Sequence, residues 1–221
     1  MKLSARTIDL LKNFNLISPI GLIFPEGNVI SVEPQPHRTM VAVAEIDETV
    51  EDRFAINDVT QLCNCIESFN TPQLVLKGTK LIVSDVTNQS QGLFTLNTAN
   101  ESTIKVPRTI KFPVDDSNII FQLTADIYSR IMKGIAVVQS PHIAIIGDGT
   151  SLSCSGYNKE NSGINQFNIP LGDTNKTIKF IIDVNNFNKL YKHYDYLVTL
   201  SQKGIAKFAG DRLTYYLAEC S

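Results

Sequence analysis

The sequence lacks the features that mark membrane-spanning or secreted proteins. It has 221 residues, no tryptophan and four cysteines, and no apolar run approaches the ~20 residues of a membrane span. The opening MKLSARTIDLLKNF breaks its apolar pattern with charged residues, so we expect no signal peptide. We therefore predict a cytoplasmic protein with reduced thiols at Cys63, Cys65, Cys154 and Cys220.

The sequence also lacks an excess of basic residues. Its formal net charge is -2, with 43% apolar and 19% charged residues. This composition is typical of globular proteins and argues against a protein that coats nucleic acid through its overall charge. Local basic patches remain open, and the length allows two domains of about 110 residues each.

Recognisable catalytic and metal-binding patterns are missing as well. His37, His142 and His193 have no second ligand at metal-binding spacing, and Cys63 and Cys65 project from different sides of a predicted helix. Gly147-Asp148-Gly149 lacks the third glycine of a dinucleotide fingerprint and is better explained as a hairpin turn. No Gly-Lys-Ser/Thr phosphate-binding motif occurs. We therefore predict no enzyme, no catalytic residues, no metal and no cofactor.

Two stretches repeat the same order of elements at a spacing of roughly 125 residues, which indicates a duplicated domain. Residues 54–85 align with residues 180–211, and both predict a strand, a helix and two more strands. Asn57 and Asp183 stand at the predicted helix N-caps. A Lys-Gly turn joins the last two strands of each copy, at Lys77-Gly78 and Lys203-Gly204.

A second pair of helices is predicted at the start of each half, over residues 4–14 and 124–134, each after a Ser or Thr cap. Alternating segments such as GLIF, NVISV, TMVAVAEI, HIAIIG and TSLSCSG predict strands between the helices. The fold class is therefore α+β, with two similar lobes of two helices packed on antiparallel sheets. We place the first domain at 1–108, including most of a connector at about 97–113, and the second at 109–221.

The polar faces of three of the four predicted helices share a net positive charge. Across all four faces, six of the nine charged side chains are basic, and none of the six lies on the second helix, which carries Glu67. A basic face on an acidic body suits one-sided contact with phosphates, although Lys and Arg also simply solvate helix faces. The basic residues are Arg6, Lys12, Arg130, Lys133, Lys189 and Lys192.

Several short motifs occur in order along the chain. The opening Met1-Lys2-Leu3-Ser4 is followed by Thr7 and by Leu10-Leu11-Lys12-Asn13-Phe14. The second half contains Gly156-Tyr157-Asn158-Lys159, Leu171-Gly172-Asp173, Phe180-Ile181-Ile182 with Asn186, and Lys203-Gly204 before Ala206-Lys207-Phe208 with Gly210. In this order, these motifs resemble those of the sliding clamps of T-even-type bacteriophages, the processivity factors of the replicative DNA polymerase.

This resemblance implies a DNA-clamp fold whose chains assemble head to tail into a homotrimeric ring. Helices would line the hole, and duplex DNA would pass through it in loose, non-specific phosphate contact. The six basic residues would then face DNA, with Glu67 as a departure. The function implied is to tether the polymerase for processive phage DNA synthesis in the cytoplasm of the infected bacterial host. The alternative is a β-rich phage structural or assembly protein that oligomerises without encircling DNA.

The resemblance also implies partners: the DNA polymerase, an ATP-dependent clamp loader and late-transcription factors that serve viral transcription. In the family, short apolar peptides bind beside the connector between the domains. That location corresponds here to Ile104, Val106, Pro107 and Ile110. The alternative reading is that these residues only pack the connector onto the second domain.

Overall fold

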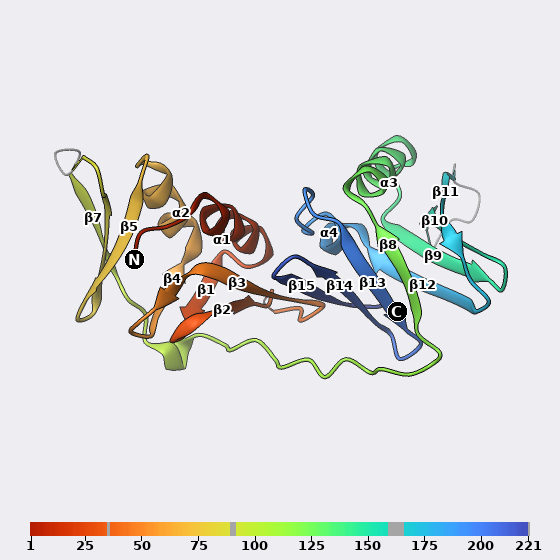
Figure 1. The fold of residues 1–221 in the computed structure, drawn as a ribbon, viewed down its shortest axis with the longest axis horizontal. Coiled ribbons are helices and arrows are strands. Elements are labelled where there is room, and N and C mark those ends of the chain that lie inside the picture. The colour runs from red at the N-terminus through yellow and green to blue at the C-terminus, as the bar shows by residue number, and fades with distance from the viewer. Residues whose placement is uncertain (35, 89–91, 159–165, 221) are drawn as a thin grey trace. The chain divides into compact units, whose positions relative to one another are not determined.

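The computed structural model describes residues 1–34, 36–88, 92–158 and 166–220 (Figure 1). The chain divides into two compact units, Met1–Arg108 and Thr109–Ser221. No helix in the described ranges is long and apolar enough to span a membrane. Lys159, the last residue of one clamp-like motif, lies outside the described residues.

The first unit alternates two helices with antiparallel strands. β1 pairs with β4, β2 pairs with β3, and β5, β6 and β7 form a third sheet with β7 at one edge. The elements are α1 (Ala5–Ile17), β1 (Ile20–Phe24), β2 (Gly27–Val32), β3 (Met40–Val50), β4 (Phe54–Asp58), α2 (Val59–Glu67), β5 (Pro72–Lys77), β6 (Lys80–Asp85) and β7 (Leu93–Asn97).

The second unit repeats this order. One sheet has the order β11-β10-β9-β12, and β8, β13, β14 and β15 are hydrogen-bonded in the order β8-β13-β14-β15. The elements are β8 (Ile119–Leu123), α3 (Ala125–Val138), β9 (His142–Asp148), β10 (Ser151–Tyr157), β11 (Asn168–Asp173), β12 (Thr177–Asp183), α4 (Val184–Phe187), β13 (Tyr196–Ser201), β14 (Ile205–Gly210) and β15 (Leu213–Ala218).

The duplication extends to the N-terminal residues. In the second unit β8 pairs with β13, and in the first unit Lys2 forms an isolated bridge with Gln73 of β5. The Leu3 N–H donates to Pro72 O at 2.9 Å, and Leu74 N–H donates to Met1 O at 2.8 Å. In each unit, the segment just before the first helix therefore pairs with the strand that follows the second helix. The predicted α+β class and the repeat of helices and strands are confirmed.

Each unit has its own core between helices and sheets. In the first, Leu10, Leu11 and Phe14 of α1 are fully buried, and the rings of Phe24 and Phe54 stack at 4.6 Å between centroids. In the second unit the core is aromatic, with fully buried Phe187, Phe208, Tyr196 and Tyr215. Burying a large apolar side chain stabilises a fold by about 1.5–3 kcal/mol, so these contacts hold the helices on the sheets.

Helix caps follow the sequence prediction at three of the four helices. Ser4, Thr124 and Asp183 each accept a hydrogen bond from a backbone N–H in the first turn. The prediction of Asn57 as the cap of α2 was wrong. Asp58 caps this helix and accepts from Gln61 N–H at 2.7 Å, because β4 continues through Asn57 and ends one residue later.

Two further details were not predicted. Asn13 of α1 is polar but only 5% exposed, since α1 packs against both β3 and α2. The predicted connector is partly ordered, because Ala99 N–H donates to Ala55 O and Glu101–Thr103 forms a 3-10 turn. Arg53 pairs with Glu101 at 2.6 Å.

The cap of α2 gives a test of the one-residue correction. We expect Asp58→Ala to lower the free energy of unfolding by about 1 kcal/mol, since it removes the N-cap acceptor. The control Asn57→Ala removes an exposed strand residue and should change it by less than about 0.5 kcal/mol. Urea unfolding followed by circular dichroism measures both, and equal losses in the two variants would contradict the assignment.

Candidate functional site

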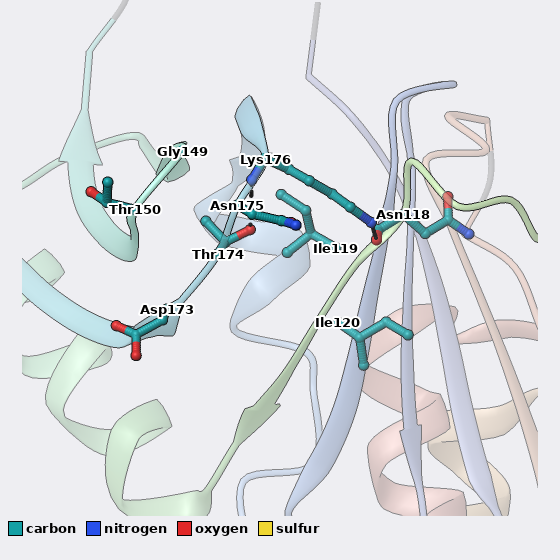
Figure 2. A pocket seen from close by; sticks show the side chains of 9 residues that line it. All are labelled: Asn118, Ile119, Ile120, Gly149, Thr150, Asp173, Thr174, Asn175 and Lys176. Atoms are coloured by element: carbon teal, nitrogen blue, oxygen red, sulfur yellow. Dashed lines mark hydrogen bonds between the residues drawn. The ribbon is translucent and has the colours of Figure 1, made fainter.

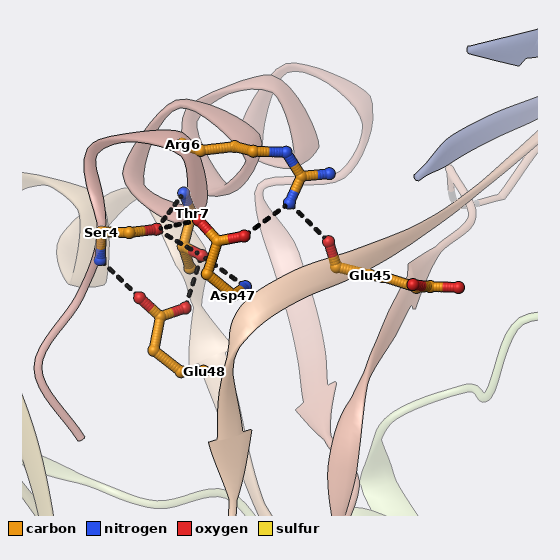
Figure 3. A network of polar contacts seen from close by, with 6 residues as sticks. All are labelled: Ser4, Arg6, Thr7, Glu45, Asp47 and Glu48. Carbon is orange, nitrogen blue, oxygen red and sulfur yellow. Dashed lines mark hydrogen bonds and ion pairs between the residues drawn. The ribbon is translucent and has the colours of Figure 1, made fainter. Parts of the chain in front are cut away.

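The start of α1 is held to β3 by a polar network (Figure 3). Glu48 accepts hydrogen bonds from Ser4 N–H and the Thr7 hydroxyl, and Asp47 accepts from the Ser4 hydroxyl at 2.8 Å. Carboxylates at this end of a helix are stabilised by its dipole. Arg6 joins the network, since its guanidinium donates to Glu45 O at 2.7 Å and lies 3.4 Å from Asp47. Arg6 is therefore directed onto β3, and its side chain is only 18% exposed.

Lys12 and Glu67 form an ion pair between α1 and α2. Lys12 Nζ lies 2.9 Å from Glu67 Oε1, and both side chains are about half exposed, at 45% and 50%. The hydrogen bond to Glu67 raises the pKa of Lys12 above its ordinary value. An exposed pair of this kind contributes about 0–1 kcal/mol to stability, so its main effect is on local charge. The first unit thus places an acidic partner beside each of its two candidate basic residues.

The second unit presents its basic residues differently. Arg130 and Lys133 are exposed on α3, on the side opposite the buried Tyr128 and Ile131. Within the described ranges neither residue forms an ion pair. The polar face predicted for α3 is therefore present, and it exposes these two basic side chains together with Asp126 in the first turn.

Lys189 and Lys192 were predicted on the exposed face of a fourth helix, and that placement was wrong because α4 ends at Phe187. The following turns are tight, with Lys189 N–H donating to Asn186 O and Leu190 N–H to Phe187 O. Two tyrosines from the sheet then hold the chain out of helical geometry: Tyr191 N–H donates to the Tyr215 hydroxyl at 3.2 Å, and the Tyr196 hydroxyl donates to Tyr191 O at 2.6 Å.

The turns after α4 still leave part of the predicted charge at the surface. Lys192 is exposed, whereas Lys189 is half-buried. Of the six predicted basic residues, the structure therefore leaves Arg130, Lys133 and Lys192 exposed without an acidic partner in the described ranges.

A cavity of about 400 Å³ in the first unit lies beside the connector. Of the predicted partner-binding residues, Ile104 and Pro107 line it, Val106 is 63% exposed, and Ile110 is not among its lining residues. The residues that β1 and β2 contribute to the cavity were not predicted, because nothing in the sequence of those strands distinguishes them from core strands. The cavity wall also includes Ile20, Ile23, Val32, Glu33, Pro36 and Lys105.

A second hollow of about 600 Å³ in the second unit is open, and polar residues line it together with Ile119 and Ile120 (Figure 2). Lys176 Nζ donates to Asn118 O at 2.6 Å and also to Asp116 O, so this lysine fixes the chain where it enters β8. The Asn118 side-chain oxygen is buried and has no hydrogen-bond partner among the described residues. None of these residues belongs to the predicted sites, and the cationic group is already used by backbone carbonyls.

The cysteines and histidines do not form a reactive centre in the described ranges. Burial raises the pKa of the Cys63 thiol to about 11 and of the Cys154 thiol to about 12, so neither is a thiolate near neutral pH. No group of three or more His, Cys, Asp and Glu among the described residues is arranged to hold a metal ion.

The architecture of the chain is the fold of DNA sliding clamps. It matches the structure of PCNA from A. fulgidus bound to the C-terminal region of FEN-1 with a TM-score of 0.74 and 10% identity, over 100% of this chain and 97% of that one. PCNA from Thermococcus kodakaraensis matches with a TM-score of 0.72 and 14% identity, over 100% and 99% of the two chains.

Sequence similarity connects the chain to the clamps of bacteriophages within this fold. Residues 121–220 match the family model described as gp45 sliding clamp, C terminal. The chain is also 26% identical to the sliding clamp of Vibrio phage KVP40 over 224 residues, covering 99% of this chain and 98% of that protein. The resemblance to T-even-type phage clamps is thereby confirmed.

Proposed function

We propose that this protein is a sliding clamp that encircles duplex DNA and tethers the replicative DNA polymerase during phage DNA synthesis. The observation that carries the proposal is similarity to a phage clamp over nearly the whole chain, combined with a clamp fold in both units. Sliding clamps are processivity factors without catalytic activity, in keeping with the absence of enzyme motifs. The alternative, a structural or assembly protein, explains neither similarity.

DNA contact in this proposal is electrostatic and uneven between the two units. Arg130 and Lys133 on α3, with Lys192 after α4, supply exposed positive charge in the second unit. In the first unit, Lys12 is compensated by Glu67, and Arg6 is directed onto β3. Contacts to phosphates position a protein on DNA without reading its sequence, which suits a protein that must slide. We therefore assign the main DNA contact to the second unit.

The ring in this proposal is a homotrimer, closed through open sheet edges. β7 ends one sheet of the first unit, and β11 ends one sheet of the second. An unpaired edge strand is a template for pairing with another chain. Leu93 and Phe94 on β7 are 59% and 41% exposed, an unusual composition for a free edge. We propose that β7 of one copy and β11 of the next form the seam between subunits.

The cavity beside the connector is the proposed site for partner peptides. Its lining is mainly apolar, and its two charged residues are Glu33, which is paired with arginines, and the exposed Lys105. This combination fits a peptide with apolar side chains and a nearby carboxylate, as on a tail of the DNA polymerase. The clamp loader and late-transcription factors would use the same kind of contact in the cytoplasm of the infected host.

The encircling of DNA has a direct topological test. Single chains are mixed with nicked circular DNA and then concentrated, so that rings assemble around the DNA. The complex is isolated by gel filtration. We expect the protein to remain on intact circles and to leave after one restriction enzyme linearises them, because a ring can slide off free ends. Equal retention on circular and linear DNA would contradict the clamp function.

The unequal charge of the two units predicts unequal effects of matched substitutions. Lys133→Gln should reduce the slope of log binding constant against log salt concentration by about 0.9 for each phosphate that the side chain neutralises. Lys12→Gln should reduce it by less than half as much, because Glu67 already offsets that charge. Duplex binding measured by fluorescence anisotropy at several salt concentrations tests this prediction. Equal changes of slope in the two variants would show that the first unit contacts DNA as strongly as the second.

The proposed seam predicts that a charge on β7 separates the subunits. Leu93→Asp should shift the sedimentation of the protein from a trimer to a single chain, because a buried carboxylate at the interface would lack a partner. Leu197→Asp is the matched control, since Leu197 is 49% exposed on β13, a strand inside its sheet. A trimer that survives Leu93→Asp at low protein concentration would place the seam elsewhere.

A further inference from the structure

Glu33 is a buried carboxylate that no sequence motif marks. Its side chain is 1% exposed and follows β2 at the wall of the connector cavity. A buried carboxylate is costly unless it is paired and hydrogen-bonded. Its partners are two arginines: Arg38 Nε lies 3.5 Å and Arg108 Nε 3.2 Å from the same oxygen, Oε1.

Arg108 is bound through its backbone as well as its side chain. Its N–H donates to Glu33 Oε2 at 3.1 Å, and its Nη2 donates to Arg38 O at 2.8 Å. Both oxygens of Glu33 are therefore used, and the chain is fixed at the residue where the first unit ends. The contact joins residues 75 positions apart in the sequence.

The other end of this short segment is fixed by packing. Gly21 in β1 has a φ of +80°, and a Cβ atom built on it would lie 3.0 Å from Ile104 Cγ2. Ile104 is therefore seated where β1 has no side chain. In the segment from Ile104 to Arg108, Ile104, Lys105 and Pro107 line the cavity.

We propose that Glu33 is a positioning residue for the partner-binding site. By holding Arg108, it keeps residues 104–107 in place as one wall of the cavity, so that an apolar peptide meets a preformed surface. This inference rests on the proposed peptide site. A wall that must be ordered during binding would lower affinity, because the binding free energy must then also offset the loss of its conformational freedom.

The test uses three variants of the full chain. Glu33→Gln removes the charge that binds both arginines. Arg108→Gln removes one arginine and leaves Glu33 paired with Arg38, so it keeps the fold testable if the first variant is unstable. Lys111→Gln is the control for Arg108→Gln, because it also removes one positive charge but at an exposed connector position past the anchor.

Two measurements separate the anchor from the peptide site. The first is the rate of tryptic cleavage after Lys105 in the native protein. The second is the affinity for a fluorescein-labelled peptide of the last twelve or so residues of the DNA polymerase from the same phage. In Arg108→Gln and Glu33→Gln we expect at least tenfold faster cleavage and at least tenfold weaker peptide binding, with Lys111→Gln close to the unsubstituted chain.

Unchanged cleavage in Arg108→Gln and Glu33→Gln would overturn the anchor itself. Faster cleavage with unchanged peptide affinity would overturn the positioning role, although the peptide site would stand. If the unsubstituted chain does not bind the peptide while the variants are cleaved faster, the peptide site fails and the anchor is purely structural.

Discussion

Packing of amphipathic helices against antiparallel sheets is the constraint on which both units depend. Each long helix buries one face, through Leu10, Leu11 and Phe14 in α1 and through Tyr128 and Ile131 in α3. The opposite face is left polar and available for charge. β7 and β11 each lie at an edge of their sheets.

Charge compensation within the chain decides which polar faces remain positive. Arg6 and Lys12 lie on the polar face of α1, as Arg130 and Lys133 do on α3. However, Lys12 is paired with Glu67. Arg6 contacts Asp47 and the Glu45 carbonyl. A charge that is already paired attracts a phosphate less. Glu33 is a buried acidic residue that two arginines neutralise, and the same ion pairs hold the connector in place.

Local patterns predicted most of the fold, and long-range contacts explain the failures. Helix periodicity, strand alternation and the caps Ser4 and Thr124 depend on neighbouring residues, so they could be recognised. The path of the chain after α4 involves hydrogen bonds to Tyr196 and Tyr215, which come later in the chain. The partners of Arg6, Lys12 and Glu33 are likewise distant in sequence, so exposure of a basic residue could be predicted but its pairing could not.

Because the two units belong to one chain, their sequences can differ, and this affects the symmetry of the proposed ring. A ring built from identical single units would repeat the same electrostatic potential at every unit. Here one half carries the ion pair Lys12–Glu67, and the other carries Arg130 and Lys133, which form no ion pair with any described residue. In the proposed trimer the potential around the hole would therefore alternate, with threefold rather than sixfold periodicity, and a DNA helix would be drawn toward the three copies of α3.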